Sequence, residues 1–132
     1  MALDIGVGNG SSFVPVQGEP SLGLGDDAPY WFLQPFFERL AAQTGQYIDL
    51  YGDASFAGVQ LAALKEMLTE AQRLTESQPD SWEVPVGTQV SPVRQELSKR
   101  LDREVLLNLL AAWQRVVVRA EQLGCPVVCF GD

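Results

Sequence analysis

The clearest hydrophobic pattern in the chain lies between residues 55 and 77. Apolar or small side chains recur there with the three- and four-residue spacing of one helix face: Leu61, Leu64, Leu68, Ala71 and Thr75. Met67 and Leu74 widen this face. Glu66, Glu70 and Arg73 fall on the opposite side. The pattern predicts an amphipathic helix that ends at the turn sequence of residues 77–81.

A second helical region is predicted from Ser91-Pro92, a cap followed by a first-turn proline, to Gly124. This region is too long for a typical single helix, which allows a break near Leu101-Asp102. From 102 to 123 the sequence is apolar nearly all round, so burial must stabilise a helix that contains three consecutive valines. We expect this to be the central helix, packed antiparallel to residues 55–77.

Shorter patterns complete the expected fold. Residues 2–7 alternate like a strand, the turn Gly8-Asn-Gly10 follows, and 12–16 is the expected return strand. A loop is expected over 18–29 and a helix over about 35–43, in which Pro35 suits the first turn. Further strands are expected at 47–51, 82–86 and 126–130. The order predicts one α+β domain over 1–132, a small antiparallel or mixed sheet against two to three helices.

The composition and the first residues of the chain indicate where in the cell the protein is expected. A chain of 132 residues with 46% hydrophobic residues can bury a core without metal or disulfide. No apolar run reaches the roughly 18 residues of a membrane span. The first residues, Met1-Ala-Leu-Asp-Ile-Gly6, lack the basic and apolar parts of a secretory signal. The expected location is therefore the cytoplasm.

Charge is distributed unevenly along the chain, whose net charge is −8. Residues 1–90 carry twelve acidic and three basic side chains, whereas 91–132 carry five acidic and six basic ones. An acidic surface repels nucleic acid and anionic lipid and attracts a cationic partner. The expected partner is a basic protein, with no nucleic acid and no membrane. The alternative is that the acidity only keeps the protein soluble.

Catalytic candidates are few, because the chain has no histidine. The best are two strand ends that share the sequence Gly-Asp, at Asp53 and Asp132. If the two strands are neighbours, these residues approach each other, and Asp26, Asp27 or Asp49 would join them in a Mg²⁺ or acid–base site. The favoured interpretation is structural, with Asp53 capping the following helix. Cys125 and Cys129 are expected to be ordinary core thiols. No catalytic residue, metal or cofactor is therefore assigned.

Aromatic residues crowd the segment beside Asp26-Asp27, and a smaller group follows at Trp82-Glu83. Aromatic anchors next to carboxylates are typical of binding hot spots for basic proteins. The predicted partner-binding residues are Asp26, Asp27, Tyr30, Asp49, Asp53, Trp82 and Glu83. A second hypothesis is a small metal-dependent enzyme that uses Asp49 and Asp53. A third is an accessory subunit or homodimer in which the aromatic cluster is the interface.

Three segments resemble small immunity proteins encoded beside bacterial toxins, including those of polymorphic-toxin and type VI secretion systems. They are Tyr51-Gly-Asp53 before a long helix, Trp82-Glu-Val-Pro-Val86, and the terminal Val127-Val-Cys-Phe-Gly-Asp132. The resemblance covers roughly residues 46–132. It implies a non-enzymatic protein that binds a cognate toxin and blocks its active site or its assembly, without a cofactor.

Overall fold

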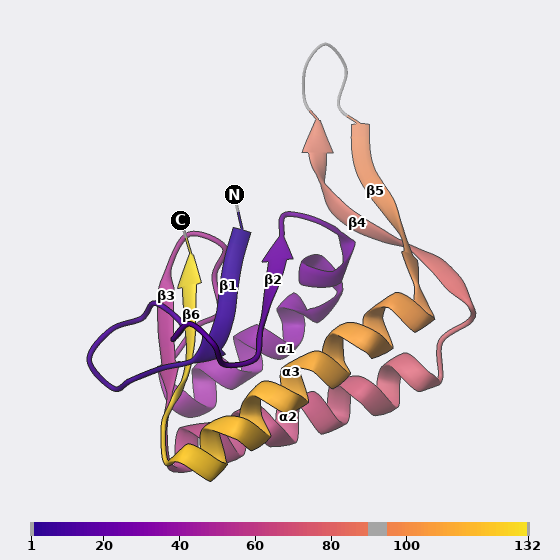
Figure 1. Ribbon diagram of the computed structural model, residues 1–132. Coiled ribbons are helices and arrows are strands. Elements are labelled where there is room, and N and C mark those ends of the chain that lie inside the picture. The colour runs from indigo at the N-terminus through magenta and orange to yellow at the C-terminus, as the bar shows by residue number, and fades with distance from the viewer. Residues whose placement is uncertain (1, 90–94, 132) are drawn as a thin grey trace.

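The computed structural model describes residues 2–89 and 95–131, which form an α+β fold (Figure 1). In chain order its elements are β1 (Ala2–Val7), β2 (Ser21–Gly25), α1 (Ala28–Thr44), β3 (Asp53–Phe56), α2 (Val59–Glu76), β4 (Ser81–Gln89), β5 (Gln95–Asp102), α3 (Arg103–Leu123) and β6 (Val127–Gly131). The predicted fold class, with its long C-terminal helix, is confirmed.

An antiparallel sheet with the strand order β2-β1-β6-β3 forms one layer of the fold. The alternation predicted for residues 2–7 places Leu3, Ile5 and Val7 on the covered face, where they are almost completely buried. The helices cover this face (Figure 1). Because β6 pairs with both β1 and β3, the last strand of the chain lies inside the sheet.

The other layer is built around α3, which contacts β1, β2, β6 and α2. Two contacts show that α2 and α3 run antiparallel, as predicted: Lys65 Nζ lies 3.3 Å from Glu121 Oε1, and the Gln114 amide donates to Gln72 Oε1 at 2.9 Å. Trp113 of α3 is fully buried and packs against Phe37 of α1 with ring centroids 5.9 Å apart. Its core-facing residues make α3 the central helix.

The prediction of a helix that begins at Ser91 is wrong for residues 95–102, the part of this segment before α3 that the structure describes. Ser91 and Pro92 themselves lie outside the described residues, but Gln95–Asp102 is strand β5, paired antiparallel with β4. Leu97 and Leu101 are four residues apart, a spacing that fits one face of a helix and one face of a strand equally well. Pairing with β4 decides between the two. The helix begins at Arg103, where a break was allowed.

The predicted return strand at 12–16 is also wrong, because the partner of β1 is β2, inside the segment expected to be a loop. Asn9 Oδ1 accepts hydrogen bonds from the backbone N–H groups of Ser11 and Ser12, which holds a turn in place of a hairpin. The loop is fastened to α3 by Glu19, whose carboxylate meets Arg119 at 2.7 and 3.1 Å. This hydrogen bonding from Arg119 lowers the pKa of Glu19.

Two boundaries in the middle of the chain differ from the prediction. The helix expected over 35–43 begins at Ala28, so Pro35 lies inside α1 and not in its first turn. The strand expected over 47–51 is displaced to Asp53–Phe56. Asp53 therefore opens a strand and does not cap α2, whose N-cap is Gly58.

Candidate protein-binding site

An open groove of about 500 Å³ lies between α1 and β4. The residues that line it include Trp31, Phe32, Gln34, Trp82, Glu83 and Pro85, and we call it the aromatic groove. Its β4 wall belongs to the β4–β5 hairpin, which projects from the body of the molecule (Figure 1). Three of its lining residues carry large aromatic rings that remain partly exposed, which is the composition of a binding hot spot.

The rings of the groove are held in place by neighbouring rings. Phe32 and Trp82 meet edge to face with centroids 5.1 Å apart, which connects α1 to β4. Trp31 meets the buried ring of Tyr30 in the same geometry, also at 5.1 Å. Such pairs contribute about 0.5–1.5 kcal/mol beyond area burial. A partner would therefore meet ordered aromatic side chains.

One exposed carboxylate lines the groove, and a second lies at its edge, hydrogen-bonded to a lining tryptophan. Asp26 Oδ1 accepts a hydrogen bond from Trp31 Nε1 at 2.6 Å, and Glu83 lines the groove directly. Arg100 lies opposite Glu83 in the β4–β5 register, but its Nε is 2.9 Å from Asp102 Oδ1. Within residues 2–89 and 95–131, neither Asp26 nor Glu83 has a cationic side chain within 4.0 Å.

Asp27 and Tyr30, both predicted to bind a partner, have structural contacts beside the groove. Asp27 caps α1 by accepting the Ala28 N–H at 2.8 Å, and Lys99 Nζ lies 3.5 Å from the same oxygen. Tyr30 is buried and donates its hydroxyl to the Ile48 carbonyl at 3.0 Å. Burial raises the pKa of Tyr30. These two residues fix the start of α1, which positions Trp31.

Asp49 and Asp53 lie apart from the groove, at the end of the sheet where β6 finishes. Asp53 stands opposite Phe130, and Phe130 stands opposite Asp4, so the two carboxylates flank one ring on the outer face of the sheet. Asp49 accepts the Tyr51 N–H at 3.2 Å. The predicted residues thus divide into two groups, one at or beside the groove and one around the end of β6. Asp4 was missed, although the alternation of residues 2–7 places it on the outer face.

The hypothesis of a carboxylate site at the Gly-Asp strand ends requires that the two strands are neighbours, and β3 and β6 do pair in the sheet. Asp132 lies outside the described residues. Within the described ones, no group of three or more His, Cys, Asp or Glu side chains is placed to hold a metal ion. Cys129 is buried and burial raises its pKa to about 12, so the thiol is not poised as a nucleophile at neutral pH.

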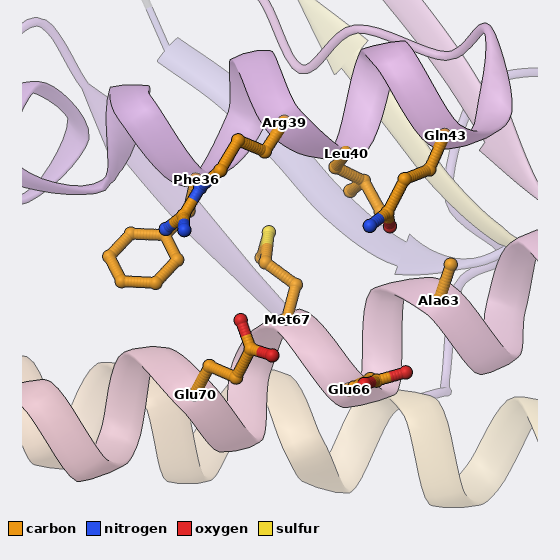
Figure 2. A pocket seen from close by; sticks show the side chains of 8 residues that line it. All are labelled: Phe36, Arg39, Leu40, Gln43, Ala63, Glu66, Met67 and Glu70. Carbon is orange, nitrogen blue, oxygen red and sulfur yellow. The ribbon is translucent and has the colours of Figure 1, made fainter.

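A smaller hollow of about 200 Å³ lies between α1 and α2 (Figure 2). The guanidinium of Arg39 lies over the Phe36 ring, 4.6 Å from its centroid. Met67 and Glu70 face the same space from α2 (Figure 2). Here the aromatic ring is already covered by a cation of the chain itself. The aromatic groove differs in this respect and is the better candidate for an external partner.

The chain matches no family model, no curated protein and no solved structure in the comparisons with known proteins. In the part of the chain that the structure describes, no helix is long and apolar enough to cross a membrane. The fold and site define an α+β protein that carries an open groove lined by partly exposed aromatic side chains and an exposed carboxylate.

Proposed function

We propose that this protein is a bacterial immunity protein, which binds a cognate toxin and neutralises it without carrying out a reaction of its own. The observation that carries the proposal is the aromatic groove with Asp26 and Glu83, two carboxylates that have no cationic neighbour among the described residues. The resemblance of residues 46–132 to immunity proteins supports the same function. Its place of action is the cytoplasm.

Shape and charge both favour binding of a basic protein. Ordered aromatic rings supply contact area at a low entropy cost, and residues of this kind dominate measured interface energies. The surplus of carboxylates in residues 1–90 attracts a cationic surface and accelerates association. A toxin that acts on nucleic acid has such a cationic surface in its substrate cleft, and an acidic partner would compete for it.

The test begins with the reading frame upstream of this one. Its C-terminal domain is expressed in a bacterial host with and without the present chain. We expect growth arrest by that domain alone, restored growth on co-expression, and a stable complex of the two purified proteins. A toxic domain that this chain neither binds nor neutralises would contradict the proposal, as would a product that is not toxic.

A matched pair of variants locates the interface. Asp26→Asn with Glu83→Gln removes two charges at the groove, and Glu66→Gln with Glu70→Gln removes two exposed charges from α2. We expect only the first pair to weaken the complex strongly. Sedimentation of the chain alone separates a monomer from the homodimer hypothesis, since a stable dimer through the aromatic residues would leave no free groove.

A further inference from the structure

We infer that the aromatic groove recognises an arginine side chain of the toxin, held between aromatic rings and the carboxylates of Asp26 and Glu83. This inference rests on the proposed function and specifies the chemistry of its partner. It follows from three features of the groove: the partly exposed rings, the carboxylates that have no cationic neighbour among the described residues, and the pairing of Lys99 and Arg100 with other carboxylates.

The rings provide the surface on which a cation binds. Trp31, Phe32 and Trp82 line a shallow, open hollow of about 500 Å³, along which a long side chain can lie. A cation is attracted to the face of an aromatic ring, most strongly to tryptophan. The chain itself contains one such contact between a cation and an aromatic ring, where Arg39 lies over Phe36 between α1 and α2.

The charge balance of the described residues favours a cation that comes from outside the chain. Arg100 is the cross-strand neighbour of Glu83, and opposite charges in this position usually attract each other. Arg100 instead pairs with Asp102 at 2.9 Å, and Lys99 pairs with Asp27 at 3.5 Å. The cations of β5 are thus engaged elsewhere, and among the residues that the structure describes no cation within 4.0 Å compensates the charge of Asp26 or Glu83.

Arginine fits this arrangement better than lysine. Its planar guanidinium stacks on rings and donates hydrogen bonds in several directions at once, whereas the lysine ammonium is compact and strongly hydrated. Asp26 already accepts one hydrogen bond from Trp31 through Oδ1, which leaves Oδ2 for a ligand. Glu83 lines the β4 side of the same groove, where its carboxylate would accept from the guanidinium.

Peptide titration tests this without knowledge of the toxin. The probe is a capped decapeptide with three arginines separated by Gly and Ser, compared with peptides in which lysine or uncharged citrulline replaces arginine. The chain contains three tryptophans, so three indole N–H resonances report on binding. Trp31 and Trp82 lie in the groove, and the fully buried Trp113 is an internal reference.

We expect the arginine peptide to shift the Trp31 and Trp82 resonances and to leave Trp113 unchanged. The lysine peptide should bind at least threefold more weakly, and the citrulline peptide should cause no shift. Asp26→Asn with Glu83→Gln should weaken arginine-peptide binding at least fivefold, while Glu66→Gln with Glu70→Gln should leave it within twofold. Equal binding of lysine and arginine peptides, shifts with citrulline, or an unaffected groove variant would overturn the inference.

The inference and the proposed function fail separately. If the chain neutralises its toxin but the groove variant binds that toxin as tightly as the unaltered chain, only the arginine site is wrong. If the arginine peptide binds as expected but no adjacent toxin is neutralised, the site stands and the immunity function is wrong.

Discussion

At the residue scale, Gly131 fixes how the end of β6 meets the turn before β3. A Cβ atom at this position would lie 2.6 Å from the Gly52 carbonyl oxygen and 2.7 Å from the Leu50 carbonyl oxygen. The same backbones are joined by a hydrogen bond from the Gly131 N–H to Gly52 at 3.0 Å. Since backbone atoms cannot move aside as a flexible side chain can, only glycine allows this approach.

Gly131→Ala should therefore destabilise the protein by about 1–3 kcal/mol, the usual range for overpacking. The measurement is urea unfolding followed by circular dichroism. Gly23→Ala in the edge strand β2 is the matched control, since its Cβ would lie 3.9 Å from the nearest atom, an ordinary contact. Equal stabilities of the two variants would show that the turn yields without cost.

Single residues also show where sequence reasoning reaches its limit. Asp53 after glycine fits a helix cap and a strand start equally well, and the choice depends on pairing with β6, which local sequence does not reveal. Trp82 and Glu83 were predicted as binding residues and line one groove, and the predicted Asp26 is hydrogen-bonded to Trp31 at its edge. The aromatic cluster indicated Trp31 and Phe32 only as a group, because their exposure depends on where α1 begins.

At the scale of elements, α1 contains two prolines with different consequences. Pro29 lies in the first turn, directly after the Asp27 cap, where a missing N–H costs little. Pro35 lies inside the helix and offers no N–H to the Trp31 carbonyl. The sequence prediction took Pro35 as the first-turn proline, although Asp27-Ala-Pro29 satisfies both the cap and the proline rule one segment earlier.

Replacement of Pro35 by alanine should stabilise the protein by about 1–3 kcal/mol, because the helix regains an internal hydrogen bond and loses a steric conflict. Pro29→Ala is the control in the same helix and should change stability by less than about 1 kcal/mol. Thermal unfolding of both variants measures the difference. A loss of stability in Pro35→Ala would mean that the packing of α1 depends on a bend at this residue.

At the scale of the whole molecule, the β4–β5 hairpin is attached differently from the other strands. It shares no backbone ladder with the four-stranded sheet among the described residues, and it projects from the body (Figure 1). Its anchors are side chains, notably Trp82 against Phe32 and the buried Val84 and Leu101. The hydrophobic periodicity of a sequence indicates local strands and helices, but it does not reveal which distant segments pair. The sequence therefore predicted a helix where β5 pairs with β4.

Hydrogen exchange should separate these two parts. Amides of β1 and β6, which have a strand on each side, should exchange most slowly, through global unfolding alone. Amides of the hairpin should exchange at least tenfold faster, because a two-stranded ribbon opens without disturbing the main sheet. Exchange followed by NMR at each amide decides the matter, and equal protection of β5 and β6 would show that the molecule opens only as one unit.

The interior position of β6 has a consequence for biosynthesis. A ribosome releases the chain from its amino end, so β1 and β3 emerge long before the strand that joins them. Until residues 127–131 leave the exit tunnel, both strands expose unpaired edges and apolar faces to the crowded cell interior. Stable structure of this sheet must therefore wait until residues 127–131 have emerged, and a truncated product that lacks them should be a substrate for chaperones and proteases.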